Sequence, residues 1–98
     1  MEKFCICVIY TAKSQKDAKE FILELAREGI IEKIREEDGC LKYEYFLSLD
    51  NPSCVVLYEE WREKSCQQVH MTQEHMKTAM EIKSKYIENV EIKEVFFK

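Results

Sequence analysis

The chain has few of the residues that interrupt regular structure: two glycines and one proline in 98 residues. Long irregular loops are therefore not expected. A content of 46% hydrophobic and 11% aromatic residues argues against disorder. No apolar run approaches the ~20 residues of a membrane-spanning helix. We expect a single globular domain over residues 1–98, with one hydrophobic core.

An excess of basic charge is also absent. The 15 Lys and Arg residues are outnumbered by 19 Asp and Glu residues, and the formal net charge is −4. The basic residues are interspersed with acidic ones and form no stripe, which argues against a nucleic-acid-binding protein. The first residues alternate polar and apolar types and show no signal-peptide pattern, so we expect a cytoplasmic protein.

Paired cysteine motifs are missing as well. The five cysteines are an odd number and include no CxxC pattern: Cys5, Cys7, Cys40, Cys54 and Cys66. A disulfide framework would favour an even number in an exported protein. We therefore expect reduced, mostly buried thiols, and no metal site, because nothing in the sequence brings enough ligands together.

Tryptophan and histidine are scarce and lie together. The single Trp and the two His residues are Trp61, His70 and His75. Histidine is the side chain whose unperturbed pKa lies nearest physiological pH. Their common position, where a predicted strand leads into a predicted helix, indicates a functional site there.

The periodicity of hydrophobic residues predicts a β-α-β-β-α-β order. The first helix contains Gly29, which costs about 1 kcal/mol relative to Ala in a helix and so marks a close contact or a bend. In the strand 40–49, alternation places Leu41, Tyr43, Tyr45, Leu47 and Leu49 on one face. The predicted elements are strands over 3–11, 40–49, 54–61 and 89–97, and helices over 15–36, 63–71 and 72 or 73–86.

This order is typical of the ferredoxin-like α+β fold, an antiparallel sheet with helices on one face. The strand 3–11 is apolar on both faces, with Phe4, Ile6, Val8 and Tyr10 alternating with Cys5, Cys7 and Ile9. Helices cover only one of these faces, and the other would be a large exposed apolar patch. We expect a homodimer that forms through the open face of the sheet.

Three segments resemble one known family. The stretch from Asp38 to Glu44, the strand end Tyr58-Glu59-Glu60-Trp61 and the stretch from His70 to Met76 match, in order, motifs of the antibiotic biosynthesis monooxygenase (ABM) domain. The resemblance implies a dimeric α+β barrel. It also implies oxidation of a small hydroxyaromatic or quinol by O2 without metal, flavin or other cofactor.

Under this resemblance, His70 is the candidate catalytic base or hydrogen-bond partner, and Trp61 is a candidate wall that also donates its indole N–H. The candidate substrate-binding residues are Tyr43, Tyr45, Glu59 and His75. Structural roles remain open for all of them: Trp61 as a core anchor, the tyrosines as sheet core or dimer interface, and the histidines as packing or capping residues. The five-residue offset between the histidines places them on different faces of a continuous helix, which argues against a metal pair.

Haem-degrading relatives use an Asn on the first strand, a Trp and a His. Here the first strand has Cys7 and Val8, and the positions expected for the Trp and the His hold His70 and Met80. Haem degradation is therefore not expected. Two other functions remain open, because a fold does not fix an activity. They are a non-catalytic ligand-binding or dimerisation module and an isomerase of a small carbonyl compound.

Overall fold

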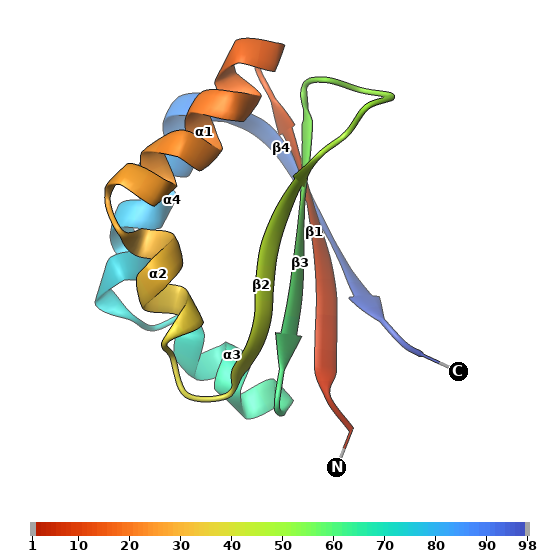
Figure 1. Cartoon of the computed structure of the whole chain (residues 1–98), viewed down its shortest axis with the longest axis vertical. Coiled ribbons are helices and arrows are strands. Elements are labelled where there is room, and N and C mark those ends of the chain that lie inside the picture. The colour runs from red at the N-terminus through yellow and green to blue at the C-terminus, as the bar shows by residue number, and fades with distance from the viewer. Residues whose placement is uncertain (1, 98) are drawn as a thin grey trace.

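The computed structural model describes residues 2–97, which form a four-stranded antiparallel sheet with helices on one face (Figure 1). The strand order is β2-β3-β1-β4, and this confirms the ferredoxin-like α+β fold. The strands are β1 (Phe4–Ala12), β2 (Cys40–Leu47), β3 (Cys54–Trp61) and β4 (Ile87–Val95). The helices are α1 (Gln15–Arg27), α2 (Ile30–Arg35), α3 (Lys64–His70) and α4 (Glu74–Tyr86).

The predicted helix 15–36 is divided into two helices. It begins as expected at Ser14, whose Oγ accepts a hydrogen bond from the Asp17 N–H at 3.1 Å. It is broken at Gly29, whose φ of 71° is in the left-handed region. The break redirects the chain, so that Ile30 and Ile34 of α2 are buried in the same core as Phe21 of α1.

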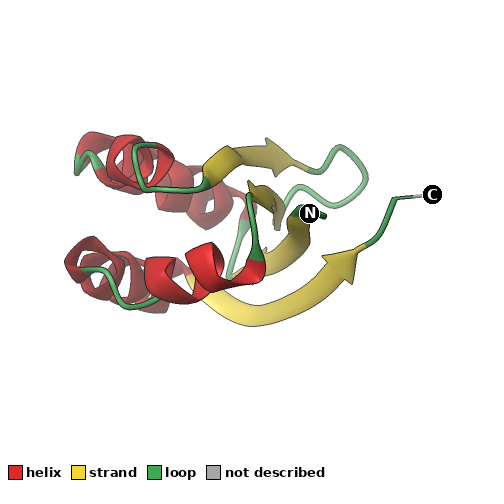
Figure 2. Ribbon diagram, turned by 90° about the horizontal axis from the view of Figure 1, so that it is seen from below, coloured by secondary structure: helices red, strands yellow, loops and turns green. Residues whose placement is uncertain are grey.

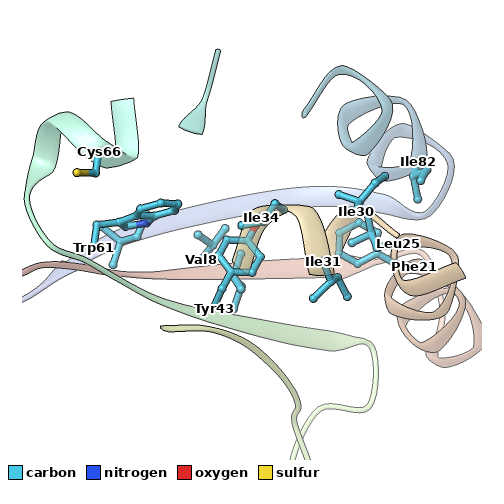
Figure 3. Close-up of a cluster of buried hydrophobic side chains, with 12 residues drawn as sticks. Val8, Phe21, Leu25, Ile30, Ile31, Ile34, Tyr43, Trp61, Cys66 and Ile82 are labelled. Atoms are coloured by element: carbon cyan, nitrogen blue, oxygen red, sulfur yellow. The ribbon is translucent and has the colours of Figure 1, made fainter. Parts of the chain in front are cut away.

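The core lies between the helices and the sheet. On β1, Ile6 and Val8 are buried there, and on β3 every second residue from Val55 to Trp61 is buried, as alternation predicts. Figure 3 shows Trp61 at one end of this cluster, beside Cys66 of α3, and Phe21 and Leu25 of α1 at the other end. The inward face of β3 carries one ionisable side chain, that of Glu59.

The strand β2 departs from strict alternation. Its pairing with β3 shifts between Cys40 and Lys42, and Cys40 packs against the core. Tyr43 and Tyr45 point inward as predicted, but Leu41 and Leu47 are 52% and 43% exposed. The predicted alternation therefore holds from Tyr43 to Leu47, whereas Leu41 lies at the register shift and Leu49 lies beyond the end of β2.

The strand β4 is an edge strand with little cover on either side. It runs from Ile87 to Val95, two residues earlier at each end than the predicted 89–97. Val90 and Ile92 are on the side of the helices, yet Ile92 is 65% exposed. Figure 2 shows the helices gathered to one side of a strongly curved sheet, with the strand that leads to the C-terminus curling away at its edge. No helix among residues 2–97 has the length and apolar character needed to cross a membrane.

On the opposite face of the sheet, no helix formed by residues 2–97 lies over the strands. This face presents apolar residues from adjacent strands that are paired in register, including Ile9 beside Val56 and Phe46 beside Val56. Phe46 is 45% exposed on this face. An uncovered apolar surface of this kind is a candidate interface.

Gly39, at the start of β2, allows a close approach between the β2 entry and α3. Its φ is +83°, and a Cβ at this position would lie 2.4 Å from Cys66 Sγ and 2.7 Å from Cys66 Cβ. Gly29 has a comparable φ of +71°, but a Cβ there would meet nothing within 4 Å. A substitution at Gly29 therefore introduces backbone strain alone, whereas a substitution at Gly39 introduces backbone strain and steric overlap with Cys66.

We predict that Gly39→Ala lowers the free energy of unfolding more than Gly29→Ala does. Both variants place Ala in the left-handed region, at about 1–2 kcal/mol. Only Gly39→Ala adds overpacking, at about 1–3 kcal/mol more. Urea titrations followed by Trp61 fluorescence measure the difference, and equal losses in the two variants would contradict the predicted overlap with Cys66.

Candidate active site

A cavity of about 170 Å³ lies between the helices and the sheet. Most of its lining is aliphatic or aromatic, and its ionisable or hydroxyl-bearing members on the sheet and α3 are Tyr10, Tyr43, Tyr45, Glu59 and His70. An apolar cavity of roughly 150 Å³ is large enough to bind benzene. The volume therefore suits a compound with a single aromatic ring.

The mouth of the cavity is formed by flexible and exposed side chains. Met71 and Met80 lie on the helical side, Val90 and Ile92 lie on β4, and Lys83 of α4 also contributes. The two methionines are each more than half exposed. Methionine adapts its shape to different apolar partners, so this rim places little restriction on ligand outline.

Glu59 is a carboxyl group buried in an apolar setting, with 4% of its surface exposed. Its Oε1 accepts a hydrogen bond from Trp61 Nε1 at 2.8 Å. Burial raises the pKa of Glu59 to about 7, although the hydrogen bond from Trp61 acts in the opposite direction, and the nearby negative charge of Glu37 adds to the rise. This carboxyl can therefore take up or release a proton near neutral pH.

His70 is 1% exposed and is held from two directions. Its Nδ1 lies 3.0 Å from each carboxylate oxygen of Glu37. Its ring stacks on Trp61 with centroids 4.8 Å apart, and meets Tyr43 edge-on at 5.7 Å. Burial lowers the pKa of His70, while Glu37 opposes that change. The ring is thus favoured in its neutral form.

The buried phenols complete the polar lining. Burial raises the pKa of Tyr10 and of Tyr43, and it does the same for Tyr45. All three remain neutral hydrogen-bond donors at physiological pH. Tyr10 was not among the predicted site residues, although it shares the inward parity of Ile6 and Val8 on β1.

Glu37 is a second ionisable residue that sequence reasoning missed. It lies between α2 and β2, and its Oε2 is 2.6 Å from His75 Nε2 as well as 3.0 Å from His70 Nδ1. In the sequence it is one of three consecutive acidic residues, and such a run usually indicates a solvated surface. Only the folded arrangement distinguishes it from its neighbours.

The predicted site residues fall into two groups in space. Tyr43, Tyr45, Glu59 and His70 line the cavity. Trp61 and His75 are not part of its lining: Trp61 is fully buried behind Glu59 and His70, and His75 lies beyond Glu37. The expected role of Trp61 as a cavity wall does not agree with this position. Residues 2–97 contain no cluster of three or more His, Cys, Asp or Glu side chains arranged to hold a metal ion.

The order of motifs and the fold agree with a comparison to protein families. The model of the antibiotic biosynthesis monooxygenase family matches residues 5–82. The chain belongs to this family. The match includes β1, β2 and β3 and extends into α4, so it contains Glu37, Glu59, Trp61 and both histidines. Among curated proteins, none matches this chain in sequence.

Solved structures share the fold. PA3566 from Pseudomonas aeruginosa is 20% identical with a TM-score of 0.84, covering 100% of this chain and 96% of that one. A conserved protein from Methanosarcina mazei is 23% identical with a TM-score of 0.84, covering 100% and 95%. A proposed antibiotic biosynthesis monooxygenase from Nitrosomonas europaea is 21% identical with a TM-score of 0.83, covering 95% and 88%. At these identities the likeness establishes the ABM fold alone.

The raised pKa of Glu59 predicts a pH-dependent stability. The folded pKa, about 7, is above the unfolded value of roughly 4.3, so the folded state binds more protons between these values and its stability falls as pH rises through this window. We predict that Glu59→Gln, which can still accept from Trp61, matches the wild type near pH 4, below the unfolded pKa. It should gain up to about 3 kcal/mol relative to the wild type near pH 8.

Glu60→Gln is the matched control, on the other face of β3. Glu60 accepts a hydrogen bond from the Tyr58 hydroxyl at 2.7 Å, which lowers its pKa, so its charge state does not change between pH 5 and 8. Its stability difference from the wild type should be constant over that range in urea titrations. A constant difference for Glu59→Gln as well would contradict the assignment.

Proposed function

We propose that this ABM protein is a monooxygenase that oxidises a small hydroxyaromatic or quinol with O2, without metal or flavin. The observation that carries the proposal is the pair formed by Glu59 and His70 in one apolar cavity. One is a carboxyl with a pKa of about 7, and the other is a buried imidazole whose Nε2 has no partner among the described residues. The family match supports the reaction class.

The proposed reaction converts a phenol and O2 into a quinone and water. A base takes the phenolic proton, and the electron-rich phenolate passes one electron to O2. Radical recombination forms a carbon–oxygen bond to a hydroperoxide. Loss of the proton on that carbon then breaks the O–O bond, leaves the quinone oxygen and releases the other oxygen as water. The phenol loses four electrons, which O2 takes up.

The cavity residues supply what the first step needs. His70 is the proposed base, through Nε2, and neutral phenols such as Tyr43 and Tyr45 are donors that stabilise the phenolate. Glu59 is positioned to exchange a second proton in the same cavity. Trp61 acts indirectly, because its indole N–H holds Glu59 and its ring supports His70.

We predict that His70→Ala lowers kcat/KM for O2 uptake by about 10²- to 10⁴-fold, because a positioned base contributes this much. Gln68→Ala, an exposed position on the same helix, is the control and should keep wild-type activity. An oxygen electrode with a panel of single-ring quinols and phenols measures the rate, and ¹⁸O2 should place one label in the product and one in water. Absence of turnover throughout, or unchanged activity in His70→Ala, would reject the proposal.

A second candidate is an isomerase of a small carbonyl compound. The specific observation in its favour is a buried carboxyl that ionises near pH 7 beside neutral tyrosine hydroxyls, which suits proton abstraction next to a carbonyl held by donors. It predicts turnover without O2 consumption and without ¹⁸O incorporation. Ligand binding with no turnover of either kind would instead indicate a non-catalytic binding module.

We also propose that the protein is a homodimer through the open face of the sheet, and that it is cytoplasmic. The uncovered apolar residues on this face support the dimer, and members of the family often dimerise. The five cysteines are all free thiols, in keeping with a reducing compartment.

We predict that Phe46→Glu shifts the protein from dimer to monomer in sedimentation velocity, because it places a charge on the open face. Leu23→Glu is the control: Leu23 is 49% exposed, similar to Phe46, but lies on α1. The control should leave the sedimentation coefficient unchanged. A wild-type monomer, or an equal response of both variants, would contradict the proposed interface.

A further inference from the structure

One carboxylate is hydrogen-bonded to both histidines of the chain. Glu37 Oε1 and Oε2 each lie 3.0 Å from His70 Nδ1, and Oε2 lies 2.6 Å from His75 Nε2. Its side chain is only 10% exposed. The three residues come from the α2–β2 connection, the end of α3 and the start of α4. They therefore connect the buried site to a histidine that lies outside the cavity.

This arrangement sets the position of the hydrogen on His70. An ionised carboxylate only accepts hydrogen bonds, so the ring nitrogens that face Glu37 both carry hydrogens. In a neutral His70, the remaining nitrogen, Nε2, then has a free lone pair. A neutral imidazole without such a partner populates both tautomers, and in one of them Nε2 is a donor that cannot serve as a base.

We propose that Glu37 and His75 are positioning residues for His70. Glu37 holds the tautomer in which Nε2 is an acceptor, and His75 competes with His70 for the negative charge of Glu37. The inference deepens the proposed function and rests on it for the catalytic consequence alone, since the hydrogen-bond geometry is independent of the reaction.

The competition follows from the different surroundings of the two rings. His70 is enclosed: Glu37 and His75 act on its charge, Tyr43 meets its ring edge-on, and Glu59 lines the same cavity. His75 is partly accessible and adjoins a surface hollow whose charged residues are Glu28, Lys33, Glu74, Lys77 and Glu81. The two rings that share Glu37 therefore differ in exposure and in their charged neighbours.

A positive charge on His75 changes the pKa of His70 in a definite direction. A positive His75 neutralises part of the charge on Glu37 and repels a positive charge on His70, so it lowers the pKa of His70.

Nitrogen-15 NMR of the imidazole rings tests the tautomer directly. The chain has only two histidines, so two rings are resolved. In the wild type, His70 should show a protonated Nδ1 and an acceptor Nε2. In Glu37→Gln, the amide can donate to Nδ1 as well as accept from it, so the tautomer should no longer be fixed, and loss of the negative charge should lower the pKa of His70 by about 1–3 units. Glu36→Gln removes an adjacent, exposed carboxylate and should change neither.

His75→Ala tests the competition, and it keeps the proposal falsifiable if Glu37→Gln does not fold. Without His75, Glu37 interacts with His70 alone. The pKa of His70 should therefore rise by about 0.5–1 unit, and its tautomer should be retained. An unchanged pKa of His70, either in His75→Ala or in a folded Glu37→Gln, would overturn the proposal.

The pH dependence of O2 uptake separates positioning from a structural role. In His75→Ala the acid limb of the kcat/KM profile should move to higher pH together with the pKa of His70, with little loss at high pH. A loss of activity at every pH without a shift would overturn the positioning role. If the NMR changes occur as expected but no substrate is oxidised, the positioning role is supported and the monooxygenase proposal is rejected. If substrate is oxidised but the NMR signals of His70 are the same in the variants, the monooxygenase proposal is supported and the positioning role is rejected.

Discussion

The arrangement of the site depends on the indole of Trp61. Its N–H satisfies one oxygen of Glu59, and its ring supports His70 at a centroid distance of 4.8 Å. A buried carboxyl without a partner would cost several kcal/mol and would be expelled or permanently protonated. The hydrogen bond from Trp61 allows Glu59 to remain buried and limits the rise of its pKa to about 7, so that Glu59 can change its protonation state near neutral pH. Trp61 therefore acts on the cavity without being exposed to it.

Alternation along the strands was enough to predict the faces of β1 and β3, the inward tyrosines of β2 and the fold. These features follow from local sequence because each strand residue has only two directions to face. The same reasoning missed the register shift between Cys40 and Lys42. At Gly29 it allowed a bend but predicted one continuous helix, where the chain forms two.

The candidate site was less predictable than the fold. Rarity of residue type led to Trp61, His70 and His75, but it could not show that Trp61 lies behind the cavity and that His75 lies beyond Glu37. Glu37 gave no signal of its own, because its partners are 33 and 38 residues away in the sequence. Contacts of this range depend on how α2, α3 and α4 pack, which single-residue patterns do not encode.

The edge strand β4 explains why a cavity exists at this place. Its inward residues Val90 and Ile92 are in register with Tyr10 and Val8 of β1, so the sheet continues past the point that α4 covers. The cavity lies beside this uncovered part of β4, and Met71 and Met80 line it without filling it. Because aliphatic and thioether groups discriminate poorly between ligands of similar size, selectivity must come from the deeper polar groups. The size of the cavity limits the size of a ligand, and the tyrosines, Glu59 and His70 are the groups able to discriminate between its polar substituents.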